Sequence, residues 1–323
     1  MIRMTFQSGL KEKEKQFVAF KQQFGHTYEA RIYNLLDFDR FCAANYPERD
    51  TLDQDIVLKW AVIRPTETAN GFAARISAVR QFGKYLAMLG EDAYIIPDSF
   101  RGGDMPLMPY IFSEATLRQF LGYTDSMERY YQSTVRHLVA PVMFRFMYCC
   151  GLRPCEARNL DRADINFENG RVFIRESKYY KERVVYAPDS LMPIILEYMK
   201  DIDCIFPDRQ PLFIHRNGIR YSYGAQQYLF EHCRDLSGIK WSGTKAPNLY
   251  SFRHTFATHR IYRWFKAGKD LGAYLSKLSA YMGHSHYKHT LYYLHFVPDI
   301  FSDMTGFDFE RFSYLIPEVA YHE

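Results

Sequence analysis

The sequence lacks the features that mark membrane proteins, secreted proteins and repeat proteins. Its apolar runs all fall well short of the roughly 20 residues that a membrane helix needs. The first residues, MIRMTFQSGLKEKEKQ, contain no apolar stretch of the kind found in secretory signals. Internal repeats and low-complexity tracts are also absent. We therefore expect a cytoplasmic protein that does not contact a membrane.

The sequence also has few cysteines and little excess charge. None of the six cysteines forms a CxxC pair, so neither a zinc ribbon nor a thioredoxin-type motif is indicated. In a reducing compartment such cysteines are expected to pack as small hydrophobic residues. The formal net charge of +4 excludes a uniformly basic coat for nucleic acid. It permits a basic face that acidic residues balance elsewhere.

The length and composition are those of a soluble globular protein with two domains. The chain has 323 residues, of which 47% are hydrophobic and 24% are charged. Apolar residues recur at three- and four-residue spacings over 30–44 and over 72–89, which predicts two helices. Gly90 is placed to end the second, and residues 50–51 can cap a short helix between them. Residues 1–100 are therefore predicted to form a helical domain.

Three basic residues lie off the apolar stripe of the helix at 72–89. They are Arg75, Arg80 and Lys84. We expect them to contact phosphates, and a solvated basic helix face is an equally good alternative.

A linker is predicted at residues 101–112. It lies in a segment with three prolines and two adjacent glycines, PDSFRGGDMPLMPYIF, between two regions of regular periodicity. The second domain, residues 113–323, opens with a helix that Ser113 can cap. A strongly apolar helix follows and ends at Gly151.

The second domain also contains a signal for a small β-sheet. An Asn-Gly pair at 169–170 lies between two runs of alternating apolar residues, which predicts a β-hairpin. The run RVVYAP from Arg183 predicts a third antiparallel strand. The predicted fold class is mainly α with a small antiparallel β-sheet, an α+β arrangement.

Four short motifs lie in order along the second domain. The first is GLRPCEARNL at 151–160, and the second is Lys178 followed by KERVV at 181–185. The third is YSFRHTFAT at 250–258, and the fourth is MGHS at 282–285 with Thr290 and Tyr293 after it. An aromatic-rich stretch such as the fourth is, by itself, most often core packing. Together the motifs supply a tyrosine with arginines, a lysine and histidines, which are groups that can bind and attack a phosphodiester.

These motifs resemble those of the tyrosine recombinase (phage integrase) family. The matching family patterns are GLR-x-x-E-x-x-x-L, GKG-x-KER-x-V, H-x-LRHTFAT and LGHSS-x-x-x-T-x-x-Y. The resemblance covers roughly residues 113–297, and the helical N-terminal segment is similar to the family's core-binding domain. It implies a two-domain clamp on double-stranded DNA and an enzyme that cuts and rejoins DNA strands. A separate arm-binding domain is not expected.

The resemblance also implies a role for individual residues. Arg153 and Arg253 would hold the scissile phosphate, His284 would assist them, Lys178 would act as general acid, and Tyr293 would be the nucleophile. The covalent phosphotyrosine would retain the energy of the broken bond, so no cofactor is expected.

The chemistry of a phosphodiester agrees with these roles. Two guanidinium groups can bind the negative charge that grows on the non-bridging oxygens during attack. A phenol with a pKa near 10 is protonated at neutral pH, so the site must help to remove its proton. His284 is a candidate for that task or for a hydrogen bond to the phosphate.

One position departs from the family pattern. The family usually has histidine three residues before the second arginine, and this chain has Tyr250 there. A tyrosine hydroxyl can still donate a hydrogen bond to a phosphate oxygen. The departure leaves open a catalytically impaired DNA-binding protein of the same fold. A monomeric enzyme resembling a type IB topoisomerase is a further alternative.

Other residues near these motifs have less specific interpretations. We expect His254 to pack or to form structural hydrogen bonds, and Tyr292 to pack, because it points about 100° away from Tyr293 on a helix. Four histidines, at 284, 286, 289 and 295, suggest a metal site, but no nearby carboxylate or cysteine completes a ligand set. No metal is therefore expected.

The tail from about residue 298 has the spacing of an amphipathic helix. It can pack on its own domain or, as the resemblance implies, reach a neighbouring subunit. Acting on two duplexes requires four active sites, so we expect a homo-tetramer on DNA. Such a protein would be associated with the nucleoid when it is bound to DNA.

Overall fold

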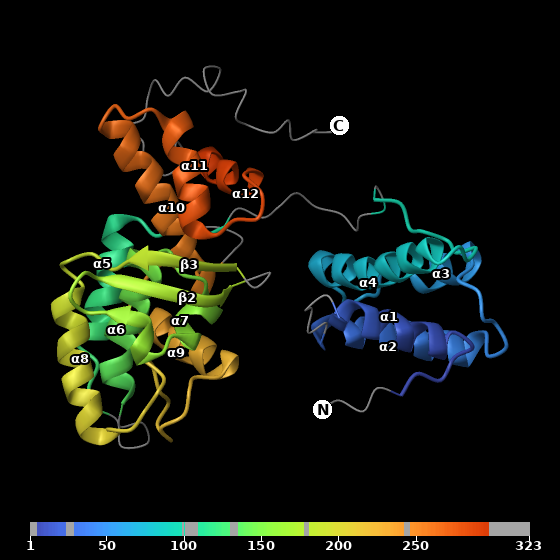
Figure 1. Ribbon diagram of the computed structural model, residues 1–323, viewed down its shortest axis with the longest axis horizontal. Coiled ribbons are helices and arrows are strands. Elements are labelled where there is room, and N and C mark those ends of the chain that lie inside the picture. Colours follow the sequence, from blue (N-terminus) through green and yellow to red (C-terminus); the bar gives the residue numbers. More distant parts are fainter. Residues whose placement is uncertain are drawn as a thin grey trace. The chain divides into compact units, whose positions relative to one another are not determined.

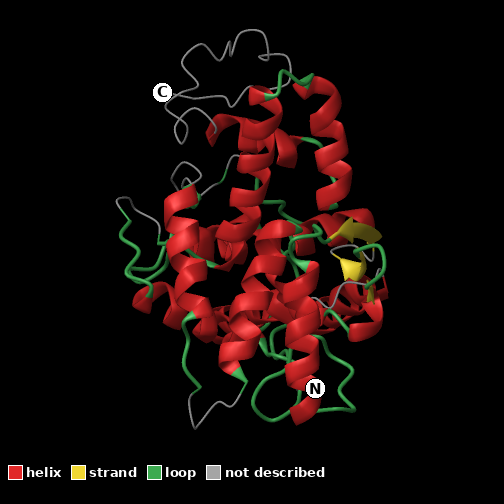
Figure 2. Ribbon diagram, turned by 90° about the vertical axis from the view of Figure 1, so that its left-hand side faces the viewer, coloured by secondary structure: helices red, strands yellow, loops and turns green. Residues whose placement is uncertain are grey.

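The computed structural model describes residues 5–23, 29–98, 100, 109–129, 135–177, 181–241 and 246–296. The chain divides into two compact units, Met1–Pro106 and Leu107–Glu323. Helices dominate both units, and the sheet belongs to the second (Figures 1 and 2). The predicted fold class, mainly α with a small antiparallel β-sheet, is confirmed. No helix in the described ranges is long and apolar enough to cross a membrane.

The described residues of the N-terminal unit form four helices. They are α1 (Lys11–Gln23), α2 (Glu29–Asn45), α3 (Gln54–Trp60) and α4 (Ala69–Met88). Their apolar faces meet in one core that includes Phe17, Leu35, Phe38, Trp60 and Phe82. The helices predicted at 30–44 and 72–89 are confirmed as α2 and α4, with small shifts at their ends.

The start of α3 differs from the prediction. The residue before its first turn is Asp53, not residues 50–51, and its side chain forms no capping hydrogen bond. The N-terminus of α4 is capped by Thr68, whose hydroxyl accepts a hydrogen bond from the Gly71 amide at 3.1 Å.

The second unit is organised around the buried helix α6 (Arg136–Cys149). α5 (Glu114–Asp125) packs against it and is capped as predicted by Ser113, whose hydroxyl accepts from the Thr116 amide at 3.2 Å. Four aromatic rings contact one another in this core, with centroid separations between 5.2 and 6.0 Å: Phe120, Phe144, Phe230 and Phe252. The apolar helix predicted before Gly151 is confirmed.

The sheet has the strand order β1-β2-β3 and is antiparallel throughout. Its strands are β1 (Ile165–Asn166), β2 (Arg171–Ser177) and β3 (Lys181–Tyr186), so the third strand begins two residues before the predicted start. Buried Val172 pairs with buried Val185, whereas the next pair is exposed. Arg183 pairs with buried Ile174 and therefore lies on the inward face of the sheet. A charged side chain in that position requires a partner.

The remaining elements are mostly helices. They are α7 (Pro154–Asn159), the 3-10 helix η1 (Arg162–Asp164), α8 (Met192–Ile205), α9 (Tyr223–Leu236), α10 (Leu249–Lys266), α11 (Leu271–Met282), α12 (Lys288–Leu291) and the 3-10 helix η2 (Tyr292–Phe296). α10 contributes Phe252 to the core around α6 and Phe256 to a second core with α11, α12 and η2. It thereby connects the two parts of this unit (Figure 1).

Candidate active site

The corner between α6 and α7 positions Arg153. Gly151 ends α6 with a φ of 61°, and a Cβ at this position would lie 2.4 Å from the Phe256 ring, so only glycine fits. Pro154 then starts α7 with a pre-set φ. Between them, Arg153 donates to the Glu156 carboxylate at 2.7 Å and to the Gly283 carbonyl at 2.8 Å.

The second arginine of the motifs lies in the middle of the unit. Arg253 projects from α10, is 3% exposed, and donates to the Gly151 carbonyl at 2.7 Å and the Met282 carbonyl at 2.6 Å. These bonds join the α6–α7 corner to the end of α11. Burial, followed by the charge of Arg153, lowers the pKa of Arg253 to about 10. The guanidinium therefore stays charged at neutral pH.

Glu156 is the carboxylate that these arginines share. It accepts hydrogen bonds from Arg153 at 2.7 Å and from Arg183 at 2.7 and 2.8 Å, and it lies 4.0 Å from Arg253. Burial opposes its ionisation, but the hydrogen bonds and charge of Arg183, with the charge of Arg253, lower its pKa to about 2. Three guanidinium groups thus face one carboxylate. The site keeps an excess of positive charge, which suits a phosphate.

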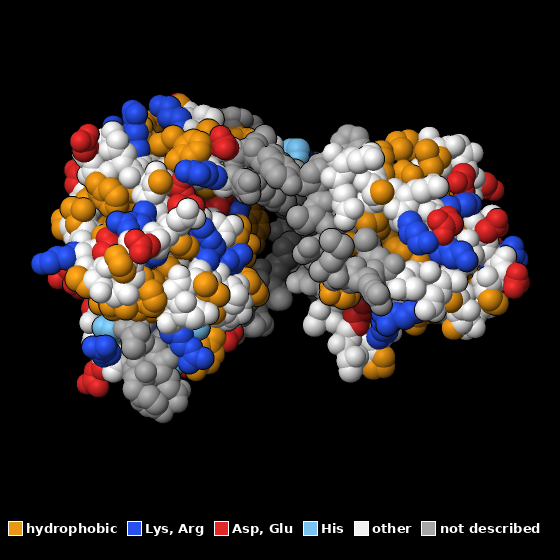
Figure 3. Space-filling model, turned by 60° about the horizontal axis from the view of Figure 1, so that its bottom comes forward, with side chains coloured by type: hydrophobic (Ala, Val, Ile, Leu, Met, Phe, Trp, Pro, Cys, Tyr) orange, Lys and Arg blue, Asp and Glu red, His pale blue; other side chains and the backbone are white. Residues whose placement is uncertain are grey.

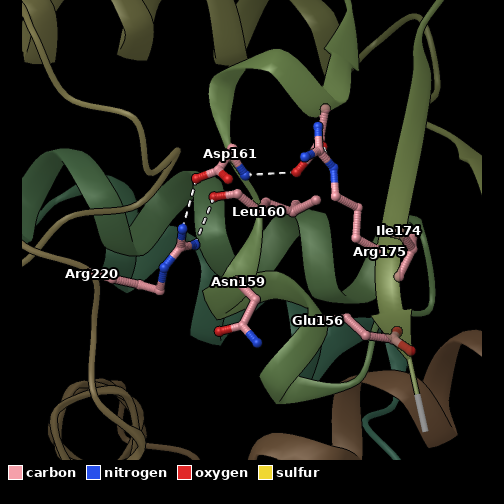
Figure 4. Close-up of a pocket in the computed structure, with 8 residues that line it drawn as sticks. Glu156, Asn159, Leu160, Asp161, Ile174, Arg175 and Arg220 are labelled. Carbon is pink, nitrogen blue, oxygen red and sulfur yellow. Dashed lines mark hydrogen bonds and ion pairs between the residues drawn. The ribbon is translucent and has the colours of Figure 1, made fainter. Parts of the chain in front are cut away.

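A cavity of about 360 Å³ lies on another side of Glu156. Arg220 donates there to the Asp161 carboxylate at 2.7 Å and to the Leu160 carbonyl at 3.2 Å (Figure 4). Arg175 forms an ion pair with Asp164 at 2.6 Å. The Arg175 pair holds the segment after α7 against β2, and Arg220 joins the same segment to the chain between α8 and α9.

His284 follows the left-handed end of α11. Gly283 has a φ of 64°, and a Cβ there would lie 3.2 Å from Arg183. Nδ1 of His284 lies 2.7 Å from the Thr290 hydroxyl, and its ring stacks on the Tyr293 ring with centroids 6.2 Å apart. Burial, followed by the charges of Arg253 and Arg153, lowers the pKa of His284 to about 3. The imidazole is therefore neutral at pH 7.

Tyr293 lies on η2 and is 4% exposed. Its hydroxyl is 3.2 Å from Nδ1 of His254. Burial raises the pKa of the phenol, whereas the charges of Arg253 and Arg153 oppose that rise. The neighbouring Tyr292 is half-buried and packs within the core of α10 and α11, which agrees with the expected packing role.

Tyr250 lies in the first turn of α10 and is 47% exposed. Its ring centroid is 6.5 Å from that of His254. Burial raises the pKa of its hydroxyl, and the charges of Arg153 and Arg253 oppose this effect. The hydroxyl therefore remains protonated at neutral pH and can donate a hydrogen bond.

The structure thus brings Arg153, Arg253, His284 and Tyr293 together, with Tyr250 on the same helix as Arg253. Lys178 lies outside the described residues.

The residues predicted to contact DNA in the N-terminal unit differ in burial and in their hydrogen-bond partners. Arg75 is 3% exposed and donates to the Glu67 carboxylate at 2.6 and 2.7 Å and to the Trp60 carbonyl at 2.8 Å. These bonds give Arg75 a structural role, so its predicted phosphate contact has no support here. Arg80 donates to the carbonyls of Ile96, Pro97 and Phe100 and holds that segment against α4.

Lys84 is the most accessible of the three predicted DNA contacts. Its side chain is half-exposed, and it lies 4.0 Å from Asp98. This position is compatible with a phosphate contact, which stays a prediction.

Sequence reasoning missed the parts of the site that connect its elements. Glu156 and Arg183 belonged to the recognised motifs but received no role, and His254 was expected to be structural. The i, i+3 spacing of Arg153 and Glu156 is a local signal for their pairing. No local signal joins Arg183 to Glu156, because they lie on different elements.

Three of the histidines of this region, at 284, 286 and 289, lie near one another. The His284 and His289 ring centroids are 6.0 Å apart, and those of His286 and His289 are 5.6 Å apart. Within the described ranges, no group of three or more histidine, cysteine or acidic side chains is arranged to hold a metal ion.

Similar proteins are found by sequence. The model of the phage integrase family matches residues 117–298. A putative integrase/recombinase of Sinorhizobium fredii, y4rB, is 27% identical over 306 residues, covering 92% of this chain and 96% of that protein. The tyrosine recombinase XerC of Chlamydia trachomatis is 28% identical over 227 residues, covering 68% of this chain and 65% of that protein.

Similar solved structures share the fold. One is the XerH site-specific recombinase bound to a palindromic difH substrate, with a TM-score of 0.62, 18% identity, and coverage of 88% of this chain and 78% of that one. Another is the Tn1549 transposon integrase in complex with transposon right end DNA, with a TM-score of 0.66, 15% identity, and coverage of 88% and 94%. The family model spans more than half of the sequence, so the chain belongs to the phage integrase family of tyrosine recombinases.

Proposed function

We propose that this protein is a site-specific DNA recombinase that cuts and rejoins strands through Tyr293. One observation carries the proposal: a buried tyrosine lies beside two arginines whose charge a single shared carboxylate does not neutralise. That combination suits a nucleophile that attacks an anionic phosphodiester. The XerH and Tn1549 proteins, which share the fold, are bound to DNA in their structures.

In the proposed reaction, Arg153 and Arg253 bind the non-bridging oxygens of the scissile phosphate. Their bonds to Glu156 and to backbone carbonyls fix the planes of both guanidinium groups before DNA arrives. Neutral His284, whose Nδ1 is engaged by Thr290, donates to the phosphate through its other ring nitrogen. The exposed Tyr250 hydroxyl donates a further hydrogen bond.

The covalent step exchanges one phosphate ester for another. The Tyr293 oxygen bonds to phosphorus, the bond to the 5′-oxygen breaks, and Lys178 supplies the proton that this oxygen takes. The product is a 3′-phosphotyrosine and a free 5′-hydroxyl. Attack by the 5′-hydroxyl of a second duplex then gives a Holliday junction.

The proposal includes an assembly. The N-terminal unit contacts the duplex through residues such as Lys84, and the two units clamp the DNA. The active complex is a homo-tetramer held through the tail from about residue 298, which lies outside the described residues. Such an enzyme works where the DNA is, in association with the nucleoid.

Covalent trapping tests the proposal. We would incubate the protein with a library of nicked duplexes of randomised sequence and recover the DNA that stays attached in detergent. We expect an adduct with the wild-type protein and with Tyr292→Phe, because Tyr292 packs in the core. Tyr293→Phe should form none, because it has no attacking oxygen.

Two outcomes would contradict the proposal: no adduct with the wild-type protein, or as much adduct with Tyr293→Phe as with wild type. The selected duplex then separates the enzyme classes. Holliday junctions and recombinant products indicate a recombinase, whereas relaxed supercoils alone indicate the reaction of a type IB topoisomerase.

A further inference from the structure

The hydroxyl of Tyr293 meets a histidine that the family motifs leave without a catalytic role. Nδ1 of His254 lies 3.2 Å from this hydroxyl, and the two ring centroids are 5.6 Å apart. His254 projects from α10 and Tyr293 from η2, so the contact joins positions 39 residues apart in the chain.

This contact matters because the phenol must lose a proton before or during its attack. Burial raises the pKa of Tyr293, so the hydroxyl is protonated at neutral pH. A base within hydrogen-bond distance of the hydroxyl removes this obstacle.

His284 is less well placed for that task. Its Nδ1 is engaged by the Thr290 hydroxyl at 2.7 Å, and its ring plane lies 22° from that of Tyr293. Stacked rings present their faces to each other, whereas the lone pair of an imidazole nitrogen lies in the plane of the ring. Its low pKa, about 3, also makes it a weak base.

Among the residues that the structure describes, the other charged or titratable groups around the phenol offer no base. Arg153 and Arg253 are donors only. Tyr250, whose ring is 6.5 Å from that of His254, carries its own protonated phenol. His254, in contrast, has a ring nitrogen that can accept a proton, and the structure places it within hydrogen-bond distance of the nucleophile.

We propose that His254 is a catalytic residue, the general base that takes the proton of Tyr293. This inference rests on the proposed function. Nδ1 begins without a proton, and Nε2 carries the proton of the neutral ring. As the Tyr293 oxygen bonds to phosphorus, its O–H bond breaks, an N–H bond forms on Nδ1, and the bond from phosphorus to the 5′-oxygen breaks. Rejoining reverses each step and returns the proton to the phenol.

The position of His254 also compensates for the departure at Tyr250. Residue 254 follows residue 250 by four positions on α10, so it lies one helical turn further along the same helix. The chain therefore keeps a basic group on the side of α10 that faces the nucleophile, although it has a tyrosine at the usual histidine position.

The test compares His254→Asn with the wild-type protein on the duplex selected by covalent trapping. Asparagine places an amide group near the position of Nδ1 and does not titrate. We expect adduct formation to slow by about a hundredfold. In wild type the rate should rise as the imidazole loses its proton with increasing pH, and in the variant this rise should disappear.

A matched control is available on the same helix. Nδ1 of His259 also contacts a tyrosine hydroxyl, that of Tyr148 at 3.0 Å. His259→Asn should lower the midpoint of thermal unfolding and keep the wild-type pH profile of adduct formation. If His254→Asn keeps that profile as well, His254 is only a packing residue and the inference is wrong.

A second measurement does not depend on DNA. With 3-fluorotyrosine at position 293, the fluorine resonance of the free protein should shift as His254 titrates, and His254→Asn should abolish that transition. A transition that persists in the variant overturns the inference. Failure of the wild-type protein to form any adduct instead overturns the proposed function, so the two failures are distinguishable.

Discussion

At the scale of single residues, Glu156 sets the electrostatic balance of the site. Its buried carboxylate is shared by Arg153, Arg183 and Arg253, which come from three different elements. Removing one partner from a buried charge network leaves charge uncompensated, and the loss typically reaches about 3–5 kcal/mol. Glu156 therefore links the stability of the fold to the geometry of the proposed phosphate site.

We predict that Glu156→Gln lowers the free energy of unfolding at pH 7 by about 3 kcal/mol. The pKa of Glu156 is about 2 in the folded protein, below its ordinary value of 4.5. The unfolded chain therefore binds the proton first as the pH falls, and wild type loses this stabilisation between about pH 4.5 and pH 2. The variant should lack that acid-dependent loss. Urea unfolding at several pH values measures both effects.

The exposed Glu182 on β3 offers a matched control. Glu182→Gln should leave the stability and its acid dependence near the wild-type values, because exposed single charges contribute little. An equal acid-dependent loss in Glu156→Gln and wild type would show that other carboxylates carry the effect.

The arginines of this network could be identified from the sequence, but the contacts that join them could not. Arg153 and Arg253 each lie in a short motif that is visible locally. The role of Glu156 depends on Arg183, which reaches it only after β2 and β3 have paired and turned that side chain inward. Arg75 illustrates the converse, because its position off the apolar stripe suggested exposure. Its side chain folds back onto Glu67, which is eight residues earlier.

At the scale of helices and strands, α1 and α2 enclose a pair of acidic side chains. Glu14 of α1 is fully buried, and Asp39 of α2 accepts hydrogen bonds from the amides of Gln7 and Ser8 at 2.8–3.0 Å. Burial, followed by the charge and hydrogen bond of Asp39, raises the pKa of Glu14 to about 10. Glu14 is therefore protonated in the folded unit at neutral pH.

This arrangement predicts a pH-dependent N-terminal unit. Above its ordinary pKa of 4.5, Glu14 ionises in the unfolded chain but holds its proton in the folded unit up to about pH 10. Wild-type stability should therefore fall with rising pH, by up to about 1.4 kcal/mol for each pH unit. Glu14→Gln should remove this fall. Hydrogen exchange of the amides in α1 and α2 measures it within the full chain.

Glu12, exposed on the same helix, supplies the comparison. Glu12→Gln should keep the wild-type pH dependence of exchange. A fall in stability that survives in Glu14→Gln would show that the acidic pair is not its source.

Helices and the hairpin were predictable because their signals are local. The apolar spacing gave α2 and α4, and the Asn-Gly pair gave the turn between β1 and β2, where Gly170 has a φ of 66°. Tyr292 and Tyr293 were expected on an α-helix, and they lie instead on the 3-10 helix η2, which follows the short α12. Its conformation depends on packing against α10 and α11, which local spacing does not encode.

At the scale of the whole molecule, the positive charge does not form a uniformly basic surface. Lys and Arg side chains are interspersed with Asp and Glu over the face shown in Figure 3, in agreement with the small net charge of +4. The proposed DNA binding therefore depends on where individual cations lie. Arg75 and Arg80 are engaged within their own unit, which leaves Lys84 as the accessible member of the predicted set.

We predict that Lys84→Gln weakens binding to the selected duplex and to duplexes of other sequences by about the same factor. The variant should also reduce the salt dependence of binding. Each phosphate contact contributes about 0.9 to the slope of log affinity against log salt, so the slope should fall by about one. Fluorescence anisotropy of a labelled duplex over a range of KCl concentrations measures it. Lys59, which pairs with Asp55 at 2.8 Å on α3, supplies the matched control, and Lys59→Gln should keep the wild-type slope. If the slope is unchanged in Lys84→Gln, Lys84 does not contact a phosphate, because losing a phosphate contact lowers the number of counterions that binding releases. The N-terminal unit would then contact DNA through another surface.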